Sequence, residues 1–272
     1  MSVIYGKGFY KLGGTPVPKA SLTPKSGVTY ISGLSSIEPA KLTILSQAIS
    51  NNGDITSETN TVYVDYKTTH VKIDIGNQVT IALNGTNYTF DVIGFNHDTL
   101  TDANAYGKAT ATGKAGITFQ MHDLFATTYE MNSSSTNVGG WKSSVMRTST
   151  MPLMKGCLPI AWQTAIKPVN KASGLGGGSS SGTETVSDSC FLLAEIEIFG
   201  STINSVSGEG TQYAYYKAGN SKVKNNGGFA DIWWERSPLI GDSRYFCFVD
   251  SDGNAYGYLA DGSFGVAFGF CV

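Results

Sequence analysis

The chain has 272 residues, 15% of them charged, and a formal net charge of −2. That length suits one large domain or two modest ones, and the weak negative charge argues against the basic surface of a nucleic-acid-binding protein. Gly (33), Tyr (14) and Phe (13) are abundant. They favour short strands and tight turns over long helices, so we expect a β-rich α+β fold.

The first residues, MSVIYGKGFY, lack the apolar run of a secretory signal, and no stretch approaches the roughly 18 apolar residues of a membrane span. We therefore expect a protein that is made and folded in a cytoplasm. Four cysteines stand far apart without CxxC spacing, which predicts buried free thiols. They are Cys157, Cys190, Cys247 and Cys271.

Residues 1–60 are predicted to form an extended and helical segment. Leu42, Leu45 and Ile49 recur at helical spacing and predict a helix over about 37–50. Its apolar stripe has to be buried. One interpretation is that the stripe packs against the core of the same chain, and the other is that it forms an interface between copies of the chain. We expect this segment to serve attachment and oligomerisation through these three residues.

Residues 61–272 are predicted to form the second, β-rich domain. Alternating strands follow residue 61, and Asn84-Gly85 predicts a hairpin between VTIAL and YTFDVIGF. A short helix is expected around 141–154. The Gly- and Ser-rich stretch 173–188 is expected to be a flexible, exposed hairpin loop between the strand-like sequences WQTAIKPVNKA and CFLLAEIEIFG.

The C-terminus predicts a three-stranded antiparallel meander. The runs RYFCFV, NAYGYLA and FGVAFGFCV are separated by two Asp-Gly turns. Two-residue loops would place Tyr258 opposite Cys247 and Tyr256 opposite Val249. Both tyrosines would then lie on the face away from the apolar core. The same register keeps Cys247 and Cys271 about 20 Å apart, too far for a disulfide.

No catalytic constellation stands out. The pairs His97-Asp98 and His122-Asp123 would suit a metal or acid–base site only if the fold joined them, and we expect local turn and core roles instead. The stretch VDSDGN lacks the Gly and Glu positions of a calcium-binding EF-hand loop and is predicted to be a turn. We predict no metal, cofactor or catalytic residue.

The stretch DIWWERSP is interpreted as a strand end. Adjacent residues of a strand point to opposite faces, so one of Trp233 and Trp234 is expected in the core and the other at the surface. By the same argument, Glu235 and Arg236 diverge. The candidate ligand-binding residues are Trp234 and Arg236 of this stretch and Tyr256 and Tyr258 of the meander. Loop 173–188 is a further candidate contact.

The motifs IWWERSP and FGVAFGFCV resemble the W-W-x-R-S-P and G-V-x-P-x-F signatures of an uncharacterised domain family of phages, prophages and gut bacteria. The resemblance spans about 61–272, and Ala267 stands where the family often has Pro. It implies a C-type-lectin-like fold, related to formylglycine-generating enzymes and phage tail-tip variable proteins. The N-terminal region looks like a phage attachment region.

The resemblance implies a virion structural protein, of a tail, baseplate or head fibre, that displays a lectin-like domain to a host surface glycan or protein. Residues 1–60 would contact other virion proteins, and a homo-oligomer, with a trimer favoured, is expected. One alternative is a metal- or copper-dependent oxidase on the same fold, which would depend on Cys247 or His97. Another is an interaction protein outside any virion.

Overall fold

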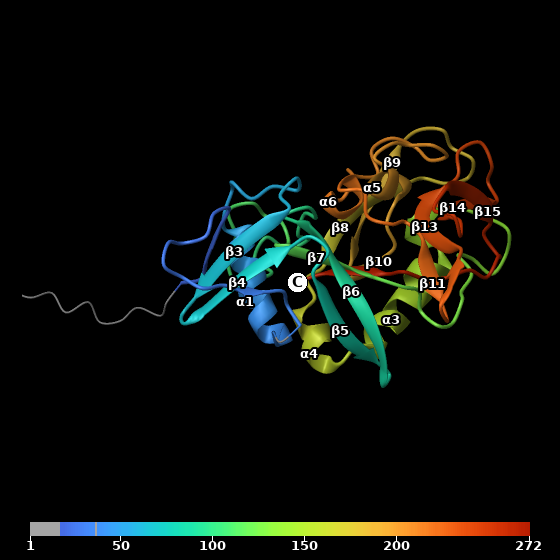
Figure 1. Ribbon diagram of the computed structural model, residues 1–272. Coiled ribbons are helices and arrows are strands. Elements are labelled where there is room, and N and C mark those ends of the chain that lie inside the picture. The colour runs from blue at the N-terminus through green and yellow to red at the C-terminus, as the bar shows by residue number, and fades with distance from the viewer. Residues whose placement is uncertain (1–16, 36) are drawn as a thin grey trace, which may run out of the picture.

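The computed structural model describes residues 17–35 and 37–272. A four-stranded sheet lies at one end of the molecule (Figure 1). The strand order is β1-β3-β4-β2, with β2 parallel to β4. Their bounds are β1 Lys19–Ser21, β2 Ile31–Ser32, β3 Thr61–Tyr66 and β4 Thr69–Asp74. This sheet crosses the boundary expected at residue 60. Of the expected attachment segment, 1–16 and 36 lie outside the described residues.

Helix α1, Pro39–Ser50, confirms the predicted helix. It contacts β1, β3 and α4 of the same chain. Leu42, Leu45 and Ile49 are completely buried there. Their assignment to attachment between copies is therefore wrong, because the chain's own core already covers their surface.

A five-stranded antiparallel sheet occupies the centre, in the order β10-β16-β7-β6-β5 (Figure 1). The predicted hairpin is confirmed: Asn84 and Gly85 have φ of 47° and 87° and join β5 to β6. Both positive φ values match the two-residue turn that favours Asn-Gly. The bounds are β5 Gln78–Leu83, β6 Thr86–Phe95, β7 Ile117–Met121, β10 Cys190–Phe191 and β16 Gly269–Cys271.

The C-terminal strand β16 lies in this central sheet, which corrects its assignment to the meander. It pairs with β7 and β10. Phe270 lies 5.5 Å from Phe119 between ring centroids, and Phe268 lies 5.5 Å from Phe90. Long-range aromatic packing therefore outweighs pairing with the nearest strand in sequence. The four cysteines are free and buried, as predicted.

The middle of the chain is helical and irregular. The helix predicted around 141–154 is present, but in pieces: α2 Gly140–Ser143, the π-helical turn η1 Met146–Thr150 and α3 Met151–Cys157. Helix α4, Ile160–Ala165, replaces strand-like sequence because Trp162 packs edge-on against Phe119 and Phe270. None of the helices in the described ranges combines the length and apolarity needed to cross a membrane.

Half of the expected long loop 173–188 belongs instead to the strands of a hairpin, β8 Val169–Gly174 and β9 Thr183–Asp188. Only 175–182 remain between the strands. The Gly177 N–H donates to Asn137 Oδ1 at 2.7 Å, which anchors the loop. After β10 the strand-like sequence turns into α5, Glu195–Phe199, and α6, Ala214–Lys217, follows.

A three-stranded antiparallel meander, β13-β14-β15, forms the other end of the molecule (Figure 1). The meander is confirmed, but its strands and register differ from the prediction. Phe248 pairs with Tyr256 and Phe246 with Tyr258, because a five-residue turn, 250–254, joins β14 to β15. The shift by one residue moves both tyrosines to the phenylalanine face. The bounds are β13 Trp233–Pro238, β14 Tyr245–Val249 and β15 Ala255–Leu259, preceded by the hairpin β11 Lys224–Asn226 and β12 Phe229–Asp231.

A bulge in β13 breaks the alternation that the sequence suggested. Trp234 pairs with Phe248 and Pro238 with Phe246, so residues 235–237 stand against Cys247 alone. Such bulges reorient side chains. Here all six residues of β13 are buried, and the charged pair in its middle points into the protein.

Candidate functional site

The most exposed aromatic surface of the meander is formed by Tyr256 and Tyr258, which are 54% and 47% exposed. Phe248 stacks beneath Tyr256 with ring centroids 6.1 Å apart, and Phe264 lies 5.0 Å from Tyr258. We call these four residues the tyrosine face. Its exposed rings rest on a packed aromatic layer, so little side-chain entropy remains to be lost on contact with a ligand.

Polar groups border the tyrosine face. A Cβ at Gly262 would lie 2.9 Å from the Tyr258 ring, so this glycine lets the ring lie against the turn. Next to it, Ser263 shares a 2.8 Å hydrogen bond with Thr128, and Asp261 accepts one from Ser135 at 2.6 Å, both exposed. Hydroxyl and carboxylate groups therefore lie beside exposed aromatic rings.

Trp234 does not contribute to this surface. Both Trp233 and Trp234 are completely buried, so the expectation that one would reach the surface is wrong. The Trp234 ring lies 4.8 Å from Phe264, and its Nε1–H donates to the Tyr129 carbonyl at 2.9 Å. Trp234 supports the tyrosine face from below and has no area left for a ligand.

Arg236 is also completely buried, which corrects its assignment to ligand binding. Its guanidinium donates to both carboxylate oxygens of Glu197 and to three carbonyl oxygens. The acceptors are Glu197 Oε2 (2.5 Å) and Oε1 (2.9 Å), Ala172 O (2.9 Å), Leu192 O (3.0 Å) and Glu209 O (2.6 Å). One side chain thus joins β8, the β10–α5 segment and the 200–213 loop to β13.

A second buried cation extends this network. Lys171 Nζ lies 2.7 Å from Asp98 Oδ1 and 2.7 Å from Glu197 Oε1. Burial alone would raise the pKa of Asp98, but the Lys171 ammonium and nearby His97 hold that pKa well below its usual value. The pKa of Glu197 is likewise lowered, because Arg236 and Lys171 outweigh burial. Both carboxyls are held as anions, with a role in joining elements.

The two His-Asp pairs are not brought together by their contacts. The His97 ring stacks on Tyr213 with centroids 3.8 Å apart. His122 Nδ1 instead lies 2.8 Å from Asp91 Oδ2, and this hydrogen bond raises the pKa of His122. Asp123 Oδ1 accepts from the Asn225 backbone. The two pairs thus have separate partners. Asp98 pairs with Lys171, far along the chain, and His97 Nδ1 is buried without a hydrogen-bond partner, so the local turn role expected for this pair is wrong.

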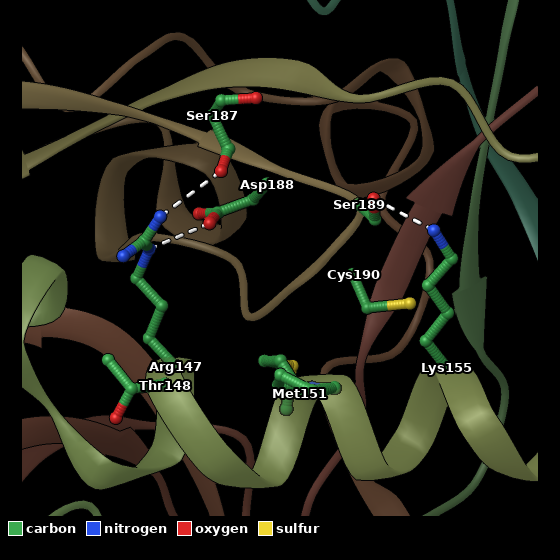
Figure 2. Close-up of a pocket in the computed structure, with 9 residues that line it drawn as sticks. Arg147, Thr148, Met151, Lys155, Ser187, Asp188, Ser189 and Cys190 are labelled. Carbon is green, nitrogen blue, oxygen red and sulfur yellow. Dashed lines mark hydrogen bonds and ion pairs between the residues drawn. The ribbon is translucent and has the colours of Figure 1, made fainter.

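A cavity of about 410 Å³ lies between the η1–α3 helical segment and the end of β9 (Figure 2). Arg147 is held there by Asp188 at 2.7 Å, whereas Lys155 Nζ has a neutral partner, Ser189 Oγ, at 3.2 Å. Burial raises the pKa of Cys190, which also lines the cavity, to about 12. Its thiol is therefore protonated and is no ready nucleophile.

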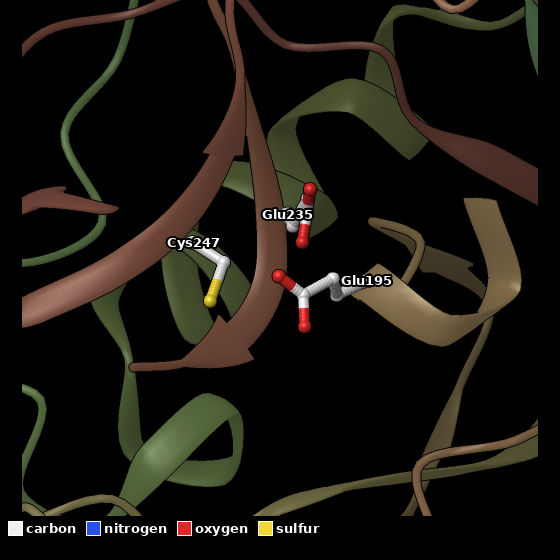
Figure 3. Close-up of side chains that lie close together, drawn as sticks. All are labelled: Glu195, Glu235 and Cys247. Carbon is white, nitrogen blue, oxygen red and sulfur yellow. The ribbon is translucent and has the colours of Figure 1, made fainter. Parts of the chain in front are cut away.

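Three chemically distinctive side chains converge behind the meander: Glu195 of α5, Glu235 of β13 and Cys247 of β14 (Figure 3). One oxygen or sulfur atom of each lies within 4.8 Å of the others. All three residues are completely buried. Burial and the neighbouring glutamates raise the pKa of Glu235 and of Cys247 well above their usual values.

Sequence reasoning did not find this cluster. Glu235 stands out only as an acid inside an apolar strand, and its partner Glu195 is 40 positions away in a stretch interpreted as a strand. A helix at 195–199 and a bulge at 235–237 were both needed to bring the groups together. Neither leaves a short-range pattern that periodicity would detect.

A family model described as "Domain of unknown function (DUF6273)" matches residues 116–272. This range includes β7, the meander, the tyrosine face and the Glu195–Glu235–Cys247 cluster, whereas the sheet β1-β3-β4-β2 precedes it. No curated protein and no solved structure matches the chain.

Proposed function

This chain belongs to the DUF6273 family, a domain of unknown function, and we propose that it is a non-enzymatic binding protein that recognises surface carbohydrate through its tyrosine face. The observation that carries the proposal is the pair of half-exposed rings, Tyr256 and Tyr258, on one face of β15. Residues two apart on a strand point the same way and lie about 6–7 Å apart. The two rings therefore form one continuous contact area.

Carbohydrate is the ligand class that best fits this chemistry. The apolar face of a sugar ring packs on an aromatic side chain, while its hydroxyl groups need hydrogen-bond partners. Asp261 and Ser263 supply an acceptor and a hydroxyl beside Tyr258. A protein ligand would use the same rings as anchors, and the binding experiment separates the two classes.

A virion is the proposed place of display. The resemblance to phage and prophage proteins supports this. The chain would belong to a tail, baseplate or head fibre, and it would be a homo-oligomer, with a trimer favoured. The N-terminal sheet would make the contacts to other virion proteins. Three exposed apolar side chains support that role: Ile31 in β2, 57% exposed, and Val17 and Leu22 on either side of β1, 68% and 46% exposed.

The binding proposal is tested with the purified full chain on an array of bacterial surface glycans. Tyr256→Ser with Tyr258→Ser is expected to weaken binding about 100-fold. A central aromatic contact typically costs more than about 1 kcal/mol on truncation, and each 1.4 kcal/mol is tenfold. Ile160→Ser is the matched control, because Ile160 is 74% exposed on α4, away from the meander.

Equal affinity of the double variant and the control would refute the tyrosine face as the contact surface. Binding to host protein but to no glycan would replace carbohydrate by protein as the ligand. The virion proposal has a separate test: light scattering of the full chain, and immunogold electron microscopy of phage particles. A monomer that is absent from particles contradicts display on a virion.

A further inference from the structure

Buried carboxyl groups outnumber buried cations behind the meander. Five buried carboxyl groups belong to connected elements there, those of Asp98, Glu195, Glu197, Glu209 and Glu235, whereas the buried cations beside them are Lys171 and Arg236. Lys171 and Arg236 make their ion pairs with Asp98 and Glu197. No ion pair within the described ranges involves Glu195 or Glu235. Neither of these two carboxyl groups therefore has a cation as its direct partner.

Glu195 and Glu235 are satisfied to very different degrees. The Glu195 carboxylate accepts backbone N–H bonds from Ile203, Asn204 and Ser205 at 2.7–3.0 Å, which hold it in place. Both carboxyl oxygens of Glu235 are buried without a hydrogen-bond partner. A buried polar group without a partner destabilises the folded state. Glu235 is therefore either tolerated at a cost in stability or completed by a ligand.

We propose that Glu195, Glu235 and Cys247 form a binding site for one divalent transition-metal ion, with Zn²⁺ as the first candidate. A thiol among the ligands selects against Mg²⁺ and Ca²⁺, which prefer oxygen donors only, and Zn²⁺ accepts mixed sulfur and carboxylate ligands. With bonds of about 2.0–2.3 Å, ligand atoms of a tetrahedral ion stand about 3–4 Å apart. Small side-chain rotations bring the three atoms from within 4.8 Å to that spacing.

The ion would act as a structural tie. Cys247 and Glu235 belong to neighbouring strands of the meander, and Glu195 begins α5 and holds the 203–205 loop (Figure 3). One ion would therefore join α5 and its loop to the back of the sheet whose other face carries Tyr256 and Tyr258. This role is independent of ligand binding at the tyrosine face.

The test uses the full chain, unfolded and refolded with Zn²⁺, with Co²⁺ or with a chelator. We expect one Zn²⁺ per chain by elemental analysis after desalting and a higher melting temperature than in the chelator. The Co²⁺ form should show thiolate-to-cobalt charge-transfer absorption. Glu235→Gln keeps the size of the side chain and should lower metal affinity more than about 100-fold, since even loss of a partner of a metal ligand costs about 10–100-fold.

Cys247→Ser should remove the charge-transfer band, whereas Cys190→Ser, at another buried free thiol, should keep it. If Cys247→Ser fails to fold, Glu235→Gln decides alone. The proposal is overturned if the wild-type chain refolds without retaining Zn²⁺ or Co²⁺, or if Glu235→Gln binds as much metal as the wild type. The proposal is also overturned if the wild-type protein is metal-free and the Glu235→Gln variant is more stable than it. Glu235 would then be a neutral buried carboxyl group.

Discussion

Replacing Arg236 by Ala is expected to destabilise the fold severely. The change removes two hydrogen bonds to Glu197 and three to carbonyl oxygens. Breaking a buried ion pair by removing one partner typically costs about 3–5 kcal/mol. Lys171, 2.7 Å from Glu197, still compensates part of its charge, whereas the three carbonyl groups lose a donor. We therefore expect a loss of about 4 kcal/mol, which lowers the melting temperature by about 8–16 °C in a domain of this size.

The measurement is urea denaturation with linear extrapolation to water. Arg244→Ala is the control, because Arg244 makes its ion pair with Asp242 at the surface, where solvent screens the charges. This variant should change the unfolding free energy much less than Arg236→Ala. The loss of unfolding free energy in Arg236→Lys should fall between those of the two Ala variants, since one ammonium group cannot replace the five donors of the planar guanidinium. If Arg236→Ala cost no more than Arg244→Ala, the network would not be what joins these elements.

Two further predictions concern buried groups and close contacts. Burial lowers the pKa of Lys224 to about 8, so the folded state disfavours the charged lysine. This penalty is full below that pKa and fades as pH rises toward the unfolded value near 10.4. Relative to Lys224→Met, the wild type should gain about 2 kcal/mol of unfolding free energy between pH 7.5 and 10, and a constant difference would contradict the pKa. A Cβ at Gly116 would meet the Ser46 carbonyl oxygen at 2.0 Å, whereas one at Gly156, inside α3, meets nothing within 4 Å. Gly116→Ala should therefore lower the melting temperature, and Gly156→Ala should raise the unfolding free energy by about 0.5–1 kcal/mol; the opposite order in thermal melts would refute the close approach.

Local signals in the sequence were sufficient for several elements. Helical spacing of Leu42, Leu45 and Ile49 located α1, and Asn84-Gly85 located the β5–β6 turn. The cysteines stand far apart without CxxC spacing, which indicated free thiols. Each of these features depends on neighbours within a few positions along the chain, where periodicity and turn chemistry act.

Register was beyond these signals. Two residues were assumed for the turn after β14, but five are present, with Asp250 accepting the N–H groups of Asp252 and Asn254. Because side chains alternate along a strand, this one-residue shift exchanged the faces of Tyr256 and Tyr258. The sequence still indicated correctly that a meander exists and that exposed tyrosines belong to it.

The amino-acid sequence by itself determined the strand-rich class, α1, the β5–β6 hairpin and the presence of a C-terminal meander. Only the tertiary structure decided that β16 joins the central sheet, that Arg236 is buried against Glu197, and that Glu195 approaches Glu235 and Cys247. These outcomes depend on packing between residues tens of positions apart and on a bulge in β13. Long-range burial and ion pairing outweigh local preference there, and such contacts leave no periodic trace in the chain.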